Sequence, residues 1–582
     1  MRLSSYLAFI FVAYCTSVTL AARCPITGPL LPSPKTLSTS PFVLDAGRRL
    51  KELLDSALTG SIEAGWQTNV TSFSIILTDT GEVPLWEYHH TASGNVNSTK
   101  NVDGDTQFMI ASITKAFTDL ALLKAGLNLD DTITKYLPEL ASSTSPIKWK
   151  DITLRALGNH MAGIPQTYGY PDDYTLKSYF ESLGFPPLSE SDYPRCGVIG
   201  LHPSCTKQQL LSGLLSSVPI FPPNTRPVYS SISFTLLGYV LEEVTGKTFG
   251  EILDTEIIQP LGMENTGLQP KNKTSGVIPP VVNVWGADFE DNSPGSGLYS
   301  TSNDITRLIK GILSLSILDT PSKVRGWLKP TAETASVYSL VGMPWEITRT
   351  ANLTPEHPHM IDIYAKDGHV PGYTSRMAVI GEYNVGFTIL TAGLTDAINP
   401  IAEALLSVFM PAIEKATRDE ATKYVGKFST PANSTINSSI TFTMDDGPGL
   451  SITEFISNST NMLDTLMTFW SLWPGSYGEP ELDLRIYPAD ISEIIGSNET
   501  NGTSGFLTRE DWRLNMEPKS TAGSNGSQLP SQRVYENVCA TWQGHDSFYY
   551  GSKPIDRFMF LKMGGDIVGV DIPSLRVTLR KQ

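Results

Sequence analysis

The chain has 582 residues, of which 40% are hydrophobic and 18% are charged, and its formal net charge at pH 7 is −16. This length exceeds what one ordinary core accommodates, so we expect two or more domains. The composition is that of a globular protein rather than a disordered one. The negative charge argues against nucleic acids and anionic membrane surfaces as partners.

The first residues have the features of a secretory signal peptide. Arg2 precedes an apolar run from Tyr6 to Cys15, and small residues follow up to Ala22. The apolar run is too short to span a bilayer, and residues 574–582 are polar and basic, so we expect neither a membrane anchor nor a lipid-anchor signal. These features predict a signal peptide over residues 1–22 and an extracellular protein.

Four of the five cysteines remain once this segment is removed. Cys196 and Cys205 lie close together in one loop and are predicted to pair, which leaves Cys24 and Cys539 as a second pair. Other pairings of the four stay open. The spacing fits no common zinc pattern, and we expect no metal and no cofactor.

Ten N-x-S/T sequons agree with a glycosylated, secreted protein. They lie at Asn69, Asn97, Asn272, Asn352, Asn433, Asn437, Asn458, Asn498, Asn501 and Asn525.

Apolar periodicity and turn signals predict alternating helices and strands after the signal segment. Helices are expected over residues 46–58, 112–126, 152–157, 230–245 and 305–315, and another begins at Asn399. Strands are expected over residues 73–77, 83–88, 361–366, 374–380 and 385–391. The first two strands and the last two strands are each predicted to form a hairpin. Helices on either side of an antiparallel sheet are the economical arrangement for this order.

The composition changes near residue 424. Beyond it Asn, Ser, Thr and Gly are frequent, and short predicted strands over 439–444, 558–563 and 575–579 alternate with turns. We therefore predict a domain over residues 23–423 and a smaller all-β domain over residues 424–582.

Ser112 and Lys115 form an S-x-x-K motif at the start of a strongly helical run. Residues three apart lie on the same face of a helix, so the hydroxyl and the amine are expected to be neighbours. A serine at a helix N-terminus also lies among backbone N–H groups that could stabilise an oxyanion. The same pattern at Ser145 and Ser204 precedes no amphipathic helix. The plain alternative is that Ser112 is an ordinary N-cap.

Two further elements follow in the chain, Tyr229-Ser230-Ser231 and Lys366-Asp367-Gly368. With Ser112 and Lys115 they resemble the motifs of the serine β-lactamase and penicillin-binding-protein superfamily, and the second motif is most similar to the Y-x-N or Y-x-S of its class C branch. Segments 129–138, 152–165, 260–263 and 297–301 resemble the family as well. The resemblance covers roughly residues 45–415, and the β-rich tail resembles the extra C-terminal domain of secreted fungal members.

This resemblance implies an α+β fold in which helices flank an antiparallel sheet beside a helical subdomain. It also implies that Ser112 is the nucleophile, that Lys115 and Tyr229 share the acid and base steps, and that Ser231 and Lys366 complete the catalytic set. The oxyanion would be bound by the backbone N–H groups of Ser112 and His369.

Asp367 and Gly368 are predicted to line the substrate pocket. Asp367 replaces the usual Thr or Ser, and an acid there is expected to repel a substrate carboxylate. Ser231 replaces an Asn able to pair with a substrate acylamide. Both departures favour an ester, lactone or amide over a β-lactam antibiotic as the substrate.

The sequence therefore predicts a secreted serine hydrolase that acts through an acyl-enzyme on a small molecule or a peptide. An acyltransferase on the same scaffold and a catalytically retired binding protein are the alternatives. No G-x-S-x-G elbow, histidine metal pattern or Gly-rich phosphate loop points to another chemistry. The oligomeric state stays open.

Overall fold

The computed structural model describes residues 25–95, 98–170, 172–198, 202–272, 274–472, 482–500, 503–518, 530 and 541–582. It divides into a larger unit, Ser33–Glu420, and a smaller unit that combines the residues up to Pro32 with Ala421–Gln582. The predicted signal peptide, Cys24, Cys539 and the sequons at Asn97, Asn501 and Asn525 lie outside the described residues.

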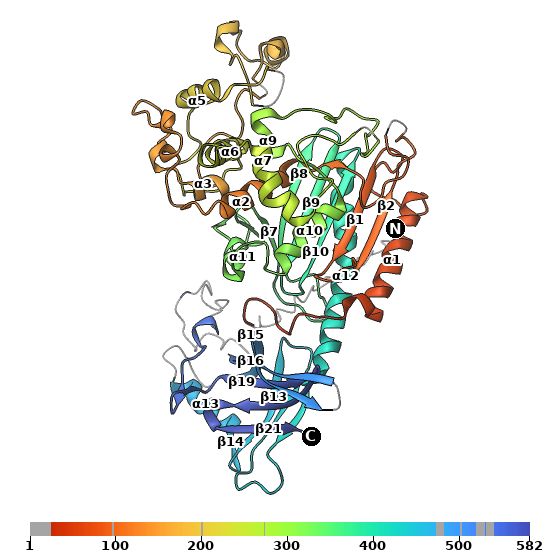
Figure 1. Cartoon of the computed structure of the whole chain (residues 1–582), viewed down its shortest axis with the longest axis vertical. Helices are drawn as coiled ribbons and strands as arrows, with labels where there is room; N and C mark the ends of the chain where they lie inside the picture. Colours follow the sequence, from red (N-terminus) through yellow and green to blue (C-terminus); the bar gives the residue numbers. More distant parts are fainter. Residues whose placement is uncertain are drawn as a thin grey trace, which may run out of the picture. The chain divides into compact units, whose positions relative to one another are not determined.

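The larger unit is built on a fully antiparallel sheet (Figure 1). Across the sheet the strands are β2 (Trp86–His90), β1 (Ser72–Thr78), β10 (Val385–Ala392), β9 (Tyr373–Ile380), β8 (Ile361–Val370), β7 (Glu346–Thr350), β6 (Ser339–Val341) and β5 (Ala332–Glu333). Both predicted hairpins are confirmed, because Phe73 pairs with His90 and Ile380 pairs with Val385. The chain thus forms the α+β fold that the sequence predicts.

Two long helices, α1 (Pro41–Leu58) and α12 (Ile398–Ala421), cover one face of this sheet (Figure 1). Their buried residues, such as Leu50 and Leu405, pack with strand residues such as Ile363 and Ile389. Helix α1 begins at Pro41, earlier than predicted, because a proline at the first helical position needs no hydrogen-bond donor.

The opposite face packs against a larger set of helices that carry the site. They include α2 (Thr114–Lys124), α3 (Leu154–Gly158), α5 (Lys207–Ser216), α6 (Ser231–Thr245), α7 (Phe249–Leu253), α9 (Ser293–Ser296), α10 (Ser302–Leu313) and α11 (Pro321–Trp327). Helix α6 is hydrophobic almost all round, and its residues Ile232 to Leu241 are all buried, as expected for a helix in the middle of a core. The short helix α4 (Lys177–Ser182) contributes no buried residue.

Strand β7 pairs with only half of β8. The pairing runs from Thr350 opposite Ile361 to Glu346 opposite Ala365 and ends there. Beyond Ala365 the short 3-10 turn η2 (Ala111–Ile113) lies against β8, since a Cβ atom on Gly368 would be 2.2 Å from the Ile110 carbonyl. The Ser375 hydroxyl of β9 donates to the same carbonyl at 2.7 Å. The end of β7 therefore creates the place where the Ser112 turn lies against the sheet.

The smaller unit is a closed antiparallel sheet with one helix, α13 (Met462–Leu472). In order, its strands are β12 (Ser439–Thr443), β11 (Gly426–Ser429), β21 (Val577–Lys581), β20 (Asp566–Ile572), β19 (Arg557–Met563), β16 (Thr503–Pro518), β15 (Leu482–Thr500), β13 (Leu450–Ser457) and β14 (Thr460–Asn461). The additional pairing of β12 with β13 closes the sheet into a barrel. The prediction of a β-rich tail is thus confirmed. The strand expected at 575 begins at Val577, because Pro573–Leu575 form a 3-10 turn.

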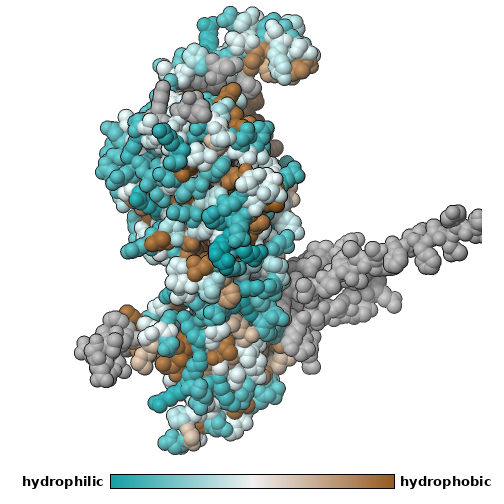
Figure 2. Space-filling view, turned by 90° about the vertical axis from the view of Figure 1, so that its right-hand side faces the viewer, coloured by the Kyte–Doolittle hydropathy of each residue, from teal (hydrophilic) through white to brown (hydrophobic). Residues whose placement is uncertain are grey.

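The structure places the predicted disulfide and several sequons, which are features expected of a secreted protein. Cys196 and Cys205 form the predicted disulfide. Six sequon asparagines are exposed, namely Asn69, Asn272, Asn352, Asn433, Asn437 and Asn458. Hydrophobic and hydrophilic residues are interspersed on the face shown in Figure 2. No helix in the described part of the chain is both long enough and apolar enough to cross a membrane.

Candidate active site

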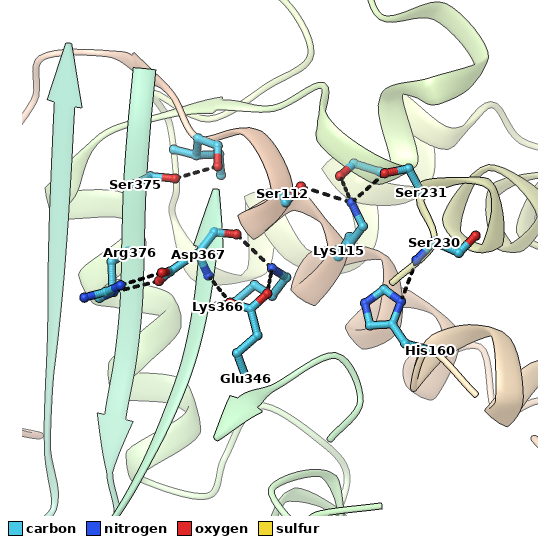
Figure 3. Close-up of polar contacts among 12 residues, drawn as sticks. Ser112, Lys115, His160, Ser230, Ser231, Glu346, Lys366, Asp367, Ser375 and Arg376 are labelled. Atoms are coloured by element: carbon cyan, nitrogen blue, oxygen red, sulfur yellow. Dashed lines mark hydrogen bonds and ion pairs between the residues drawn. The ribbon is translucent and has the colours of Figure 1, made fainter. Parts of the chain in front are cut away.

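Ser112 lies in the turn η2, immediately before α2. The side chain of Lys115, one turn further on, is buried and donates from Nζ to Ser112 Oγ at 3.1 Å. The same Nζ donates to the Gly295 carbonyl at 2.7 Å and to Ser231 Oγ at 3.4 Å (Figure 3). The N-cap alternative for Ser112 is therefore wrong: no side-chain cap bond forms at either helix start, and the hydroxyl faces an amine instead.

Tyr229 immediately precedes the N-cap of α6. Ser230 is that N-cap: its hydroxyl accepts from Ser233 N at 3.1 Å and donates to the Pro165 carbonyl at 2.8 Å. These bonds fix the backbone next to Tyr229. The ammonium groups of Lys115 and Lys366 lie 4.9 and 5.2 Å from the centre of the Tyr229 ring.

Lys366 reaches this cluster from β8. Its side chain is 1% exposed, and Nζ donates to Glu346 Oε1 at 2.6 Å and to the Asp367 carbonyl at 2.8 Å (Figure 3). Side chains alternate along a strand, and Val370, four residues further on, packs in the core on the helical face that holds α2 and α6. The ammonium of Lys366 is therefore directed to the same face as Ser112 and Lys115.

The pKa values of these three groups are shifted by one another. Burial and the nearby charge of Lys366 lower the pKa of Lys115, although Tyr229 opposes the shift. Burial alone would raise the pKa of Tyr229, but the charges of Lys115 and Lys366, with hydrogen bonds to Ser112 and Lys115, lower it. Burial alone would lower the pKa of Lys366, but the negative charges of Tyr229 and Glu346 outweigh burial and raise this pKa. The site thus favours a persistent ammonium on Lys366 beside two groups, Lys115 and Tyr229, that lose their protons more readily than usual.

Asp367 does not belong to this cluster. Its carboxylate accepts from Arg376 Nε at 2.7 Å and from Arg376 Nη2 at 2.5 Å (Figure 3). Arg376 also donates to Asn399 of α12. Strand alternation directs Asp367 to the face opposite that of Lys366. The expectation that a bare acid lines the pocket and repels a substrate carboxylate is therefore not supported, because the charge is paired on the other face of the sheet.

Gly368 lies where the strand edge meets the Ser112 turn. A Cβ atom at this position would lie 2.2 Å from the Ile110 carbonyl, 2.4 Å from Ser375 Oγ and 3.0 Å from Ser112 N. Only glycine fits this close approach between two backbones. The prediction that Gly368 is part of the site therefore has a steric reason.

The Asp367 N–H donates to Glu346 Oε2 at 3.0 Å, so it points to the side of β8 where β7 has ended. Backbone groups alternate along a strand, which directs the N–H of His369 to this same edge. The exposed His369 side chain lies on the other face, so only its backbone is available to the site.

Two further residues of the site were not assigned from the sequence. Glu346 lies on β7, twenty residues before Lys366 in the chain, and binds its ammonium. Only the register of β7 against β8 reveals this contact. His160 stacks its ring on Tyr229, with ring centres 4.5 Å apart. It lies in a segment that resembles the family, but nothing local in the sequence indicates the contact.

The structure thus brings together Ser112, Lys115, Tyr229, Ser231 and Lys366, and adds Glu346 and His160. The other two S-x-x-K serines lie apart: Ser145 accepts from the Trp149 indole at 3.2 Å, and Ser204 is exposed. Within the described ranges no group of three His, Cys, Asp or Glu side chains could hold a metal ion. The arrangement is that of a hydroxyl beside an amine of lowered pKa, which can activate a nucleophile.

The β-lactamase family model matches residues 54–406, and a second model, described as a Beta-lactamase-like-like C-terminal domain, matches residues 416–582. The chain belongs to the β-lactamase-like family. A relative named Beta-lactamase-like protein, from Arthroderma benhamiae, is 41% identical over 570 residues, which are 95% of each chain. A relative from a Phoma species named Probable hydrolase M10 is 28% identical over 531 residues, covering 88% of this chain and 84% of its own.

Solved structures are similar to this β-lactamase-like chain over its larger part. A β-lactamase/D-alanine carboxypeptidase from Pseudomonas syringae is 20% identical, with a TM-score of 0.46, and the match covers 62% of this chain and 98% of that protein. A D-stereospecific amidohydrolase from a Streptomyces species is also 20% identical, with a TM-score of 0.45 and coverage of 60% and 97%. The match to the β-lactamase family model and the relatives named as probable hydrolases identify the chain as a member of a hydrolase family with the fold of β-lactamases.

Proposed function

We propose that this β-lactamase-like protein is a secreted serine hydrolase that forms an acyl-enzyme on Ser112. The observation that carries the proposal is the approach of the buried Lys115 Nζ to Ser112 Oγ at 3.1 Å, with the Tyr229 ring beside both Lys115 and Lys366. A buried amine of lowered pKa has no use in a simple cap, but it can take the proton of a nucleophilic hydroxyl.

In the proposed reaction, Ser112 Oγ attacks the substrate carbonyl while its proton passes to the Tyr229 phenolate, directly or through Lys115. The backbone N–H groups of Ser112 and His369 bind the resulting oxyanion. Tyr229 then gives a proton to the leaving group, which departs with the electrons of the broken bond. Water, deprotonated by Tyr229, next attacks the acyl-enzyme, and as the bond from the acyl carbon to Ser112 Oγ breaks, Tyr229 returns the proton to Oγ and the acid product leaves.

We propose an ester, a lactone or an amide without a carboxylate next to the scissile bond as the substrate. The support comes from Glu346 rather than from Asp367. Glu346 holds the ammonium of Lys366 at 2.6 Å, and its own side chain is 43% exposed. A substrate carboxylate that approached Lys366 would have to displace or repel this acid.

The test compares wild type, Ser112→Ala and Ser204→Ala on p-nitrophenyl esters, a chromogenic cephalosporin and a D-Ala-D-Ala peptide. Ser204 also begins an S-x-x-K sequence but is exposed, which makes it a matched control. We expect ester hydrolysis in wild type and in Ser204→Ala and its loss in Ser112→Ala. An activated phosphonate should add its mass to the peptide that contains Ser112.

Failure of the phosphonate to label Ser112 would contradict the acyl-enzyme, and rapid cephalosporin turnover would contradict the proposed substrate class. Release of product only after an alcohol or amine acceptor is added would identify an acyltransferase. Secretion is tested separately, by finding the chain in culture medium with its mass lowered by a glycosidase. An intracellular, unmodified chain that retains residues 1–22 would contradict it.

A further inference from the structure

His160 follows α3 in a backbone conformation that few side chains adopt. Its φ is +62°, in the left-handed region where residues other than glycine are uncommon. The residue is 4% exposed, so this conformation is held inside the core of the larger unit. Such a conformation persists only where surrounding contacts determine it.

Those contacts are with three consecutive residues around Tyr229. The carbonyl of His160 accepts from Val228 N at 2.8 Å. Nδ1 of its ring accepts from Ser230 N at 3.1 Å (Figure 3). Between these two bonds the imidazole stacks on the Tyr229 ring, with ring centres 4.5 Å apart and planes inclined by 27°. One residue therefore holds the backbone on both sides of Tyr229 and one face of its ring.

The Ser230 contact also fixes the charge of the imidazole. Because Nδ1 accepts a hydrogen bond, the ring proton is on Nε2, and a second proton on Nδ1 would face the Ser230 N–H donor. Burial and the charges of Lys115 and Lys366 lower the pKa of His160 well below its usual value. The ring is thus a neutral support and adds no third cation beside the two ammonium groups.

We infer that His160 is a positioning residue for Tyr229, which keeps the phenol between the ammonium groups of Lys115 and Lys366. The inference rests on the proposed function, because it assigns Tyr229 a proton-transfer role. Without the stacked ring the phenol can turn away from its two cations. Its electrostatic stabilisation as a phenolate then weakens, and proton transfer loses its geometry.

Two substitutions separate the two kinds of contact. His160→Asn places Oδ1 where Nδ1 stood, so it keeps the acceptor for Ser230 N, and Asn tolerates a positive φ better than most residues, but the stacked ring is lost. His160→Phe keeps a ring for Tyr229 but removes the acceptor. The control is His90→Asn, since His90 also packs its ring against an aromatic ring, that of Phe73, with centres 5.3 Å apart and planes tilted by 41°. His90 lies on β2, which is separated from β8 by β1, β10 and β9.

The readout is the rate at which an activated phosphonate labels Ser112, measured from pH 5 to pH 10 and expressed per site that finally labels. Loss of folded protein lowers the final amount of label but not this rate. We expect His160→Asn to label roughly 10- to 100-fold more slowly at pH 7, because small displacements of a catalytic group cost rates of this order. The acidic limb of its profile should move to higher pH.

His160→Phe should lie closer to wild type in rate and pH profile, and His90→Asn should match wild type. Labelling of both His160 variants with the wild-type rate and profile would overturn the inference while leaving the proposed function intact. Equal slowing of both with no change in the profile would also overturn it, since that pattern indicates a general packing effect. Absence of label in wild type would instead refute the nucleophile itself, and the inference with it.

Discussion

The carboxylate of Glu346 offers the sharpest test of how the site keeps Lys366 charged. Replacing it in Glu346→Gln preserves size and an oxygen acceptor for the Asp367 N–H but removes the charge that lies 2.6 Å from Lys366 Nζ. Glu333→Gln is a matched control, because Glu333 is an exposed acid of the same sheet on β5.

The size of the effect follows from distance and exposure. Two unit charges 2.6 Å apart attract by about 6 kcal/mol at an effective dielectric constant of about 20 and by about 1.6 kcal/mol in water. Lys366 is buried but Glu346 is 43% exposed, so solvent screens the pair and the loss should lie near the lower value, about 2 kcal/mol.

The sign of the pH dependence follows from the raised pKa of Lys366, whose ordinary value is 10.5. Such a group adds stability that is fully present below pH 10.5 and is lost as the pH rises through the folded-state pKa. The Gln variant should therefore be less stable than wild type between pH 7 and pH 9, by the amount above, and the deficit should shrink at higher pH. Urea unfolding at pH 8 and at pH 11 measures it.

Activity should change in two ways. The alkaline limb of kcat/KM for a neutral ester should move to lower pH, because Lys366 loses its proton more easily. The ratio of activity on a carboxylate-bearing cephalosporin to activity on the neutral ester should rise roughly tenfold, equivalent to about 1.4 kcal/mol, because one negative charge leaves the pocket. An unchanged limb and an unchanged ratio, both equal to those of Glu333→Gln, would refute the role given to Glu346.

Three further changes test residues in and around the site, namely Gly368, Asp367 and the buried Asp119 of α2. Gly368→Ala should abolish phosphonate labelling of Ser112, because its Cβ would lie 2.2 Å from the Ile110 carbonyl oxygen. The control Gly381→Ala should label normally, because a Cβ there has no neighbour within 4 Å. Equal labelling of the two variants would contradict the steric argument. Asp367→Asn should change the ratio of cephalosporin to ester activity less than about threefold and the free energy of unfolding by about 1 kcal/mol or less, since its partner Arg376 lies on the other face of the sheet. A change in this ratio as large as that of Glu346→Gln would show that Asp367 lines the pocket. Burial raises the pKa of the Asp119 carboxyl well above 3.8, so above pH 3.8 this carboxyl ionises in the unfolded chain before it does in the folded one, which opposes folding. The stability of Asp119→Asn relative to wild type should therefore increase between pH 4 and pH 8 in urea unfolding. The same difference at both pH values would contradict this.

Local geometry was enough to predict the pairing of Ser112 with Lys115, because residues three apart on one helical turn must be neighbours. Tyr229 and Lys366 could not be joined to them by any local rule, and only the family resemblance indicated that they belong together. Apolar periodicity and turn signals predicted helices α1, α2, α3, α6, α10 and α12 and strands β1, β2, β8, β9 and β10 of the larger unit, with ends that differ by a few residues. Strands β5 to β7 and helices α5, α7 and α11 were not predicted.

The direction of Asp367 could have been predicted, since two successive strand residues cannot both point to one face. If Lys366 reaches the site, its neighbour must leave it, and Arg376 stands opposite Asp367 in the register of β8 and β9. Glu346 and His160 are different cases. Their contacts depend on the strand register and on a turn with positive φ, which the sequence around them does not specify.

The point where β7 ends explains why these residues form a site. A full ladder along β8 would have consumed the N–H groups at its edge, including that of His369. Because β7 stops at Glu346, that residue's side chain satisfies the Asp367 N–H and holds Lys366 at the same time. The next N–H on this side, that of His369, is then directed to the edge beside Ser112, where Gly368 allows the two backbones to approach. The same strand end thus brings the proposed nucleophile, an ammonium and the backbone donors proposed for the oxyanion to one place.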